Sequence, residues 1–407
     1  MLAKQAPWTD RDFYEAGESA IIADLAKLHS AREFIKYWGY PCEEHSAVCR
    51  DGFVLGLQRI PGPRGGTTSD GHALPFARPP VVVWHGLSIS SDVFVCNVRP
   101  DRNLAMVLAD AGFDVWLANS RGNKYSNGHT ALDPSRDRSH GTQFWDFAID
   151  ELSQLDMPAV VDHVLAQTGH RQLAYIGYSQ GTAQAFAALS LCADLNSKIH
   201  TFVALAPAMK PMPISSSAVG SMLHVVDPHM LFGVFGKHSF LPLAGSLRSV
   251  LPLPVYAAII ELAFRVVFGW RCDRLGSEER KRILFRNVFS DSSVKSVVHW
   301  FQIINGRKFR PFASSHAGLL GLPLRGHTQM RDLVAPYPYP TKHITTKHVH
   351  LFCGGSDNIS DVAYLEKHLP DHAKIHVVED YEHLDFLWAT DARHKVWDRV
   401  IAILKSQ

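Results

Sequence analysis

Apolar residues gather in short continuous runs along this chain, and stretches rich in helix-forming residues separate most of these runs. Such runs are typical of strands in a parallel sheet that is buried on both faces. We predict six of these strands, at 80–84, 113–118, 172–178, 201–205, 348–353 and 374–378. The intervening helices include 102–111, 154–168 and 361–369. The pattern indicates the strand–helix alternation of a doubly wound α/β fold.

Upstream of these runs, the turn pair Asp51-Gly52 separates two further segments of strand character, 46–50 and 53–60. An Asp-Gly pair between such segments favours a β-hairpin. The sheet is therefore expected to open with antiparallel strands, and the predicted total is eight.

The alternation stops between Met209 and about Tyr339, where Pro211 and Pro213 mark an exit from the core and no strand pattern recurs. Helical stretches take its place. They are 222–235, 255–270, 277–286 and 293–304. We therefore predict an α/β core formed by 1–208 and 340–407, with a helical cap or lid inserted at 209–339.

The most apolar of these stretches is 255–270, which Glu261 and Arg265 interrupt. It falls short of the ~20 residues that a membrane-spanning helix needs. Two interpretations remain, a core helix of the cap or a lid whose apolar face meets lipid. The Gly- and Pro-rich segment 61–79 is predicted to be a surface loop.

Charge and composition narrow the classes of function that are expected. The 407 residues are 46% hydrophobic with a net charge of +2, which is ordinary for a globular protein. The 41 Lys and Arg residues are dispersed among 39 Asp and Glu residues, without a dense basic stripe. A role in nucleic-acid binding is therefore not expected.

The first twenty residues lack the apolar core of a secretory signal. The six cysteines show no metal-ligand spacing and are expected to be free thiols, with Cys192 and Cys353 buried. A glycosylation sequon at 358–360 lies in a loop predicted below to carry a catalytic acid, where a glycan would block chemistry. These features favour an intracellular, cytosol-facing protein.

A pentapeptide, Gly177-Tyr178-Ser179-Gln180-Gly181, joins the strand 172–178 to the helical stretch 180–191. By itself, the pattern G-x-S-x-G arises by chance in roughly one chain in seven of this length. A strand before it and a helix after it are typical of a nucleophile elbow, in which a sharp turn exposes a serine hydroxyl at the helix N-terminus. Ser179 is the predicted nucleophile.

In this topology the acid and the histidine follow the serine. His383 lies in a short loop after the last strand and before the apolar C-terminal helix, so we predict it as the base. Asp357 follows the preceding strand by a few residues and is the predicted acid. Asp361 is a rival, although Ser360 and Asp361 have the character of helix-capping residues. Asp385, which enters the final helix, is a weaker rival.

Ester hydrolysis also needs donors for the negative oxygen of the transition state. We predict the backbone amides of Gln180 and of Leu87, the latter in the loop His85-Gly86-Leu87 after the strand 80–84. His85 precedes the serine and is interpreted as a strand-end residue that shapes this loop.

Several longer runs accompany these residues. They are YWGYP at 37–41, HGL at 85–87 with Ser90-Ser91, DVWLANSRGN at 114–123, GYSQG at 177–181, GGSD at 354–357 and EHLDFLW at 382–388. With these runs the chain, from about residue 31 to its end, resembles the acid lipases, the group of gastric and lysosomal lipases and fungal steryl ester hydrolases.

The predicted cap is more similar to that of the fungal enzymes. Only Cys272 lies within it, so the cap disulfide of the gastric and lysosomal lipases cannot form. The apolar stretch 238–270 and the run 299–301 look like the fungal steryl ester hydrolases, which act at lipid droplets and membranes, commonly through an N-terminal anchor. The first residues here show no such anchor, so contact with a lipid droplet or membrane surface is expected either through the cap itself or through a segment that precedes an incomplete start.

The resemblance implies an α/β-hydrolase fold and a serine ester hydrolase that cleaves long-chain acyl esters, steryl esters or triacylglycerols, through an acyl-enzyme intermediate. It implies Ser179 as nucleophile, Asp357 as acid, His383 as base, Leu87 and Gln180 as oxyanion donors, and no metal or other cofactor. A short-chain carboxylesterase or thioesterase, or a non-catalytic lipid-binding relative, stays as an alternative. An epoxide hydrolase or dehalogenase would need a carboxylate in place of Ser179.

Overall fold

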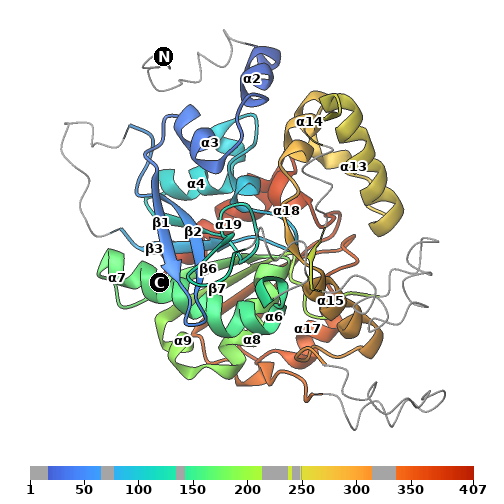
Figure 1. Cartoon of the computed structure of the whole chain (residues 1–407). Coiled ribbons are helices and arrows are strands. Elements are labelled where there is room, and N and C mark those ends of the chain that lie inside the picture. The colour runs from blue at the N-terminus through green and yellow to red at the C-terminus, as the bar shows by residue number, and fades with distance from the viewer. Residues whose placement is uncertain are drawn as a thin grey trace.

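The computed structural model describes residues 17–65, 78–133, 143–212, 237–240, 248, 250–313 and 336–407. The predicted helix at 222–235 and most of the predicted loop at 61–79 lie outside these residues. The described chain forms one large sheet with helices on both of its faces (Figure 1).

The sheet has nine strands, eight of which run in the order β1-β2-β4-β3-β6-β7-β10-β11, while β5 pairs with β2. Pairing is antiparallel from β1 to β4 and parallel from β4 to β11. The strands are β1 Glu43–Val48, β2 Phe53–Ile60, β3 Pro80–Trp84, β4 Asp114–Ala118, β5 Gly128–His129, β6 Leu173–Tyr178, β7 Ile199–Leu205, β10 His348–Gly354 and β11 Lys374–Val378. All eight predicted strands and the opening hairpin are confirmed, and β5 is an addition.

Successive side chains of each strand enter different hydrophobic clusters, because side chains alternate between the two faces of a sheet. In β3, Val83 packs in the cluster that contains residues of α3 (Ala31–Tyr37) and α4 (Leu104–Asp110). Its neighbour Val82 packs with residues of α7 (Met157–Thr168), α8 (Gln180–Leu191) and α17 (Val362–His368). The continuous apolar runs in the sequence therefore reflect burial on both faces, as predicted.

The core helices predicted at 102–111, 154–168, 180–191 and 361–369 are present, with shifts of a few residues at their ends, and the described core contains further helices that were not predicted. The helices are α2 Glu18–Leu25, α3 Ala31–Tyr37, α4 Leu104–Asp110, α6 Ile149–Glu151, α7 Met157–Thr168, α8 Gln180–Leu191, α9 Ala193–Lys198, α17 Val362–His368, α18 Asp385–Trp388 and α19 Asp398–Lys405. The first residues of the predicted helix 154–168 belong to a π-helical turn, Leu152–Asp156, which follows α6 and leads into α7 at Met157. The apolar C-terminal helix is split, because the extended backbone of Ala389 ends α18.

Among the described residues between β7 and β10, three α-helices lie within the predicted cap: α13 Leu253–Phe268, α14 Glu278–Arg286 and α15 Val294–Gly306. They match three of the four helices predicted there. Residues of α13 and α14 belong to the hydrophobic cluster of one face of the sheet, and Trp300 and Ile303 of α15 belong to that of the other. The described helices of the predicted cap therefore share the core of the α/β unit.

Two expectations from the sequence are wrong. A pair of two-residue strands, β8 Ser239–Phe240 and β9 Ser292–Ser293, lies within 209–339, where no strand was expected. Strands this short carry no alternating or apolar pattern. Cys192 is half-buried because it caps the C-terminus of α8, whereas Cys353 is buried in β10 as predicted. All six cysteines are free thiols, as expected.

Among the described residues, no helix has both the length and the apolar character that crossing a membrane requires.

Candidate active site

Ser179 lies in the turn between β6 and α8, with backbone angles φ 53° and ψ −120°. A positive φ is costly for a residue with a Cβ, and such strain clusters at functional sites. Close packing surrounds the turn: a Cβ on Gly177 would meet the carbonyl oxygen of Gly181 at 2.7 Å, and one on Gly181 would meet that of Trp84 at 2.6 Å. The predicted strand–turn–helix geometry is therefore present, and both glycines are needed for it.

Three of the predicted site residues come together at the carboxyl ends of the parallel strands. His383 Nε2 lies 2.8 Å from Ser179 Oγ, and His383 Nδ1 lies 2.9 Å from Asp357 Oδ2. Asp357 and His383 are both buried. The hydroxyl, the imidazole and the carboxylate thus form a continuous chain of hydrogen bonds, the arrangement by which serine hydrolases activate a nucleophile.

The carboxylate of Asp357 has further partners in its own loop. Ser360 Oγ donates to Asp357 Oδ2 at 2.9 Å, and the backbone N–H of Ile359 donates to Oδ1 at 2.8 Å. Ser360 was interpreted from the sequence as a helix-capping residue, and this was wrong, because its hydroxyl points to Asp357 and to the carbonyl of Pro207. Its spacing of three residues from Asp357 is the signal that could have revealed this contact.

Neither rival acid contacts His383. Asp361 is the N-cap of α17, where its side chain accepts from Tyr364 N–H at 3.0 Å and pairs with Lys210. Asp385 accepts from the backbone N–H of Glu382 at 2.7 Å. Burial, joined by the charge of Glu382, raises the pKa of Asp385 to about 7.

The loop after β3 lies directly against Ser179. A Cβ on Gly86 would come within 2.9 Å of Ser179 Cβ, so this loop requires glycine for its approach. His85 is buried and holds the loop: Nδ1 donates to the carbonyl of Gly86 at 2.7 Å, and Nε2 accepts from Ser120 N–H and Asn123 Nδ2, each at 3.1 Å. Burial lowers the pKa of His85 to about 4, so it stays a neutral structural residue.

Leu87 follows in this loop, and Gln180 is the first residue of α8. An N–H in the first turn of a helix has no acceptor within the helix, so that of Gln180 is free to face a ligand. The side chain of Gln180 accepts from Trp300 Nε1 of α15 at 2.7 Å, which ties the predicted cap to the turn that carries Ser179.

Four other side chains around these residues were not recognised from the sequence as part of the site. They are Trp270, Trp300, Asn358 and Glu382. Trp270 stacks on the His383 ring, and Asn358 and Glu382 hydrogen-bond to the segment that contains Trp270. In the sequence, Asn358 was identified only as part of a glycosylation sequon. Its side-chain amide donates a hydrogen bond to the Phe268 carbonyl at 2.6 Å.

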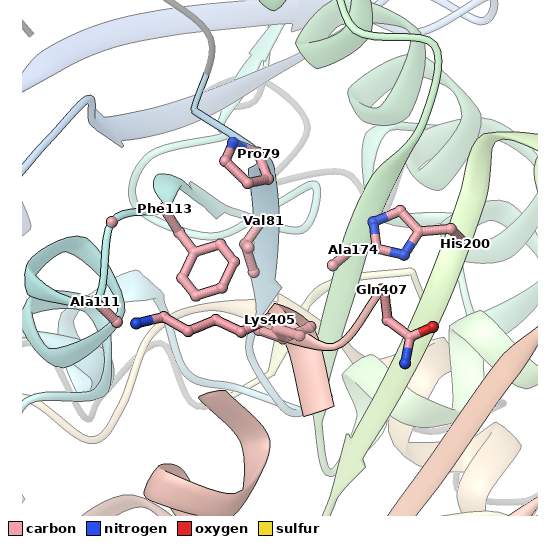
Figure 2. Close-up of a pocket in the computed structure, with 10 residues that line it drawn as sticks. Pro79, Val81, Ala111, Phe113, Ala174, His200, Lys405 and Gln407 are labelled. Carbon is pink, nitrogen blue, oxygen red and sulfur yellow. The ribbon is translucent and has the colours of Figure 1, made fainter. Parts of the chain in front are cut away.

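No group of three or more His, Cys, Asp or Glu residues with the geometry to hold a metal ion occurs in the described parts of the chain. A hollow of about 300 Å³ opens at the opposite edge of the sheet (Figure 2). It is lined by residues at the amino ends of β3, β4 and β6, such as Val81, Phe113 and Ala174, and by Lys405 of α19. This hollow is separate from Ser179, which follows the carboxyl end of β6.

Comparison with known proteins gives matches along most of the chain. Residues 79–228 match the family described as alpha/beta hydrolase fold, and residues 31–98 match the partial alpha/beta-hydrolase lipase region. A probable lipase of Schizosaccharomyces pombe is 37% identical over 384 residues, 94% of this chain and 78% of that protein. Gastric triacylglycerol lipase of Homo sapiens is 31% identical over 387 residues, 91% of this chain and 90% of that protein.

A solved structure of a hypothetical protein from Pseudomonas aeruginosa is similar in fold alone, with a TM-score of 0.51 at 10% identity over 90% of this chain and 94% of that chain. The sheet, its flanking helices and the family matches define an α/β-hydrolase. More narrowly, the chain belongs to the lipase family within this fold and is a carboxylic ester hydrolase, which confirms the resemblance to the gastric lipases.

Proposed function

We propose that this enzyme hydrolyses long-chain acyl esters, namely steryl esters, triacylglycerols or both, with Ser179 as the nucleophile. The observation that carries the proposal is the chain of hydrogen bonds from Asp357 through His383 to Ser179 Oγ, with distances of 2.9 Å and 2.8 Å. Side chains held at these distances are ready for proton transfer when a carbonyl carbon approaches the hydroxyl.

The reaction has two halves. Ser179 Oγ bonds to the ester carbonyl carbon as its proton passes to His383 Nε2, and the oxyanion is met by the amides of Leu87 and Gln180. The bond to the alcohol then breaks, and the alcohol oxygen takes the proton from His383. Water attacks the acyl-enzyme, giving a proton to His383, and release of the fatty acid returns that proton to Ser179. Asp357 holds the imidazole and faces its positive charge.

A similar lipase and the exposed surface of α13 both support the choice of a long-chain substrate. The similar human protein is named a gastric triacylglycerol lipase, which by its name acts on triacylglycerols. The likeness of the apolar stretch 238–270 to the fungal steryl ester hydrolases favours steryl esters as well. Both substrates are insoluble in water, so the enzyme must work at a lipid surface.

One face of α13 has the composition for such contact. Val255, Ile259, Leu262 and Val266 are 47%, 46%, 60% and 43% exposed, and their spacing places them on one side of the helix. The opposite side, with Ile260 and Phe264, is buried, and Glu261 pairs with Lys281 of α14 at 2.9 Å. An exposed apolar stripe on an otherwise packed helix favours insertion into the surface of a lipid droplet or membrane.

The proposed chemistry is tested with wild type and Ser179→Ala on emulsified cholesteryl oleate and triolein. We expect the variant to lose all but a residual activity, because a bound water lacks the covalent step. Ser190→Ala, on the same helix α8, is the control for folding and should keep wild-type rates. Equal activity of wild type and Ser179→Ala would contradict Ser179 as nucleophile.

Two further measurements separate the alternatives. A fluorophosphonate should label wild type at one serine and leave Ser179→Ala unmodified; failure to label the folded wild type would indicate a non-catalytic lipid-binding protein. Rates on p-nitrophenyl esters of increasing chain length should rise toward long chains. An optimum at short chains would instead favour a carboxylesterase or thioesterase.

A further inference from the structure

The imidazole of His383 is covered by a ring from the segment that follows α13. The indole of Trp270 lies nearly parallel to it, with ring centroids 5.1 Å apart and an angle of 15° between the planes. Phe268 stacks on Trp270 in turn, at 4.4 Å and 14°. Tyr178, the residue before Ser179, also packs on His383 with centroids 5.2 Å apart. The His383 ring is therefore confined by aromatic neighbours as well as by its hydrogen bonds.

The segment 268–272 is fixed by the sequence neighbours of the proposed acid and base. Asn358, next to Asp357, accepts from Trp270 Nε1 at 3.1 Å and donates to the carbonyl of Phe268 at 2.6 Å. Glu382, next to His383, accepts from the backbone N–H groups of Arg271 at 2.9 Å and Cys272 at 3.1 Å. Four hydrogen bonds from two side chains thus hold the indole in place.

The backbone of this segment requires such support. It turns sharply after α13, with φ 76° at Gly269 and φ 58° at Cys272. The second value is unusual for a residue with a side chain and is retained only where contacts enforce it. The backbone amides that follow Trp270 are bound by the buried Glu382, so the contacts and the strained conformation occur at the same place.

The physical effect on His383 follows from its two states. As the base it must keep Nε2 directed at Ser179 Oγ, and a misplacement of ~1 Å can lower the rate ~100-fold. After taking the proton it is a cation, and the face of an indole attracts a cation. Asp357 stabilises that charge at the ring edge, at Nδ1, and Trp270 lies along the ring face. The two contacts act on different parts of the same imidazolium.

We propose that Trp270 is a positioning residue for His383, holding the imidazole toward Ser179 and stabilising its protonated form during both halves of the reaction. The proposal rests on the function proposed above, in which His383 is the base. It makes the segment 268–272 the link through which the predicted cap, which carries the apolar stripe of α13, acts on the catalytic groups. A tryptophan that only filled the core would affect stability and leave turnover unchanged.

The test compares Trp270→Leu and Trp270→Phe with wild type on p-nitrophenyl butyrate, a soluble ester that needs no lipid surface. We expect Trp270→Leu to lower kcat ~10-fold with KM within about twofold, since the contact strengthens when charge develops on His383. Trp270→Phe retains a ring face and should recover part of the loss. A kcat of Trp270→Leu within about twofold of wild type would overturn the proposal.

Trp116→Phe is the matched control. Trp116 is a buried tryptophan whose ring lies 4.7 Å from that of His45, within β4 and away from Ser179. The Trp116→Phe variant should change the unfolding midpoint without changing kcat.

If Trp270→Leu does not fold, Asn358→Ala replaces it. This variant keeps every aromatic ring but removes the acceptor of the Trp270 indole N–H, and kcat should fall as it does in Trp270→Leu. An unchanged kcat in Asn358→Ala would then overturn the proposal.

Labelling of Ser179 by a fluorophosphonate distinguishes this proposal from the one it rests on. In Trp270→Leu the final extent of labelling should equal that of wild type, with a lower rate. If the wild type itself is not labelled, the serine mechanism fails. If the wild type is labelled and Trp270→Leu reacts at the same rate, only the positioning role fails.

Discussion

Burial changes the pKa of two ionisable residues near Ser179 in opposite directions, lowering that of His85 and raising that of Asp385. His85 loses basicity and remains neutral, which suits its acceptance of two N–H groups at Nε2. Asp385 lies two residues beyond His383 with one backbone N–H as its hydrogen-bond donor, and burial raises its pKa to about 7. A single N–H does not compensate a carboxylate for the loss of water.

This environment predicts a pH-dependent stability. Because the folded-state pKa of Asp385 lies above that of the unfolded chain, the folded state binds more protons between about pH 4 and pH 7. Its contribution to stability is therefore present below pH 4 and is lost as pH rises to 7. Asp385→Asn keeps an oxygen for the Glu382 N–H but never ionises, so at pH 8 it should be more stable than wild type by roughly 2–4 kcal/mol.

Urea unfolding of both proteins at pH 4 and pH 8 measures this difference, which should nearly vanish at pH 4. Asp371→Asn, at an exposed carboxylate, is the control and should follow wild type at both pH values. An equal stability of Asp385→Asn and wild type at pH 8 would mean that Asp385 is not a buried, poorly compensated acid.

At the scale of elements, the β6–α8 turn combines strain with close packing. Ser179 has a positive φ, and Gly181 allows α8 to approach the carbonyl ends of β3. A Cβ at Gly181 would meet the backbone oxygens of Trp84 at 2.6 Å and His85 at 2.8 Å. Backbone atoms in a buried strand cannot easily move aside, so the position tolerates no side chain.

Gly181→Ala should therefore destabilise the fold by about 1–3 kcal/mol and lower kcat by moving α8 with its Gln180 amide. Gly128→Ala is the matched control, because the nearest atom to its added Cβ would be Val54 Cβ at an ordinary 3.4 Å. Thermal unfolding and turnover of p-nitrophenyl butyrate report the two effects. Wild-type values of both for Gly181→Ala would contradict the close approach of α8 to β3.

At the scale of the whole molecule, helices inserted between β7 and β10 reach the proposed catalytic residues from two directions. Trp300 of α15 contacts Gln180, and Trp270 after α13 contacts His383. These helices also share the hydrophobic clusters of the sheet. The described part of the predicted cap thus packs against both the sheet and the proposed catalytic residues.

The exposed stripe of α13 gives a prediction about the molecule at a lipid surface. Leu262→Asp should reduce binding to a triolein emulsion by ~5–10-fold, because it removes apolar area and adds a charge at the proposed contact. Leu191→Asp replaces another exposed leucine, at the end of α8, and should bind as wild type does. Flotation of the emulsion measures binding.

Both variants should hydrolyse p-nitrophenyl butyrate at the wild-type rate, which shows that the fold is intact. Equal loss of binding in Leu262→Asp and Leu191→Asp would indicate that hydrophobic exposure in general, and not the α13 face, determines the contact.

Much of this architecture could be predicted from local sequence. The apolar runs located six of the eight principal strands, and the Asp51-Gly52 turn located the hairpin formed by the other two, because burial and turn chemistry act on neighbouring residues. The short strands β8 and β9 were not predicted, because a strand of two residues is too short to show a periodic pattern of apolar and polar residues. The boundaries of the cap at 209 and 339 and the cytosol-facing location stay predictions.

The sequence alone determined the order of elements and selected Ser179, Asp357 and His383 as one group, because the elbow pattern and the chain order of this fold restrict where an acid and a base can follow a serine. Only the tertiary structure decided which side chains surround that group. Trp270 on His383, Trp300 on Gln180, Ser360 on Asp357 and the buried carboxyl of Asp385 depend on distances and burial set by the packing of the whole chain. Apart from Ser360, three residues from Asp357, these contacts and environments leave no mark in the local spacing of residues.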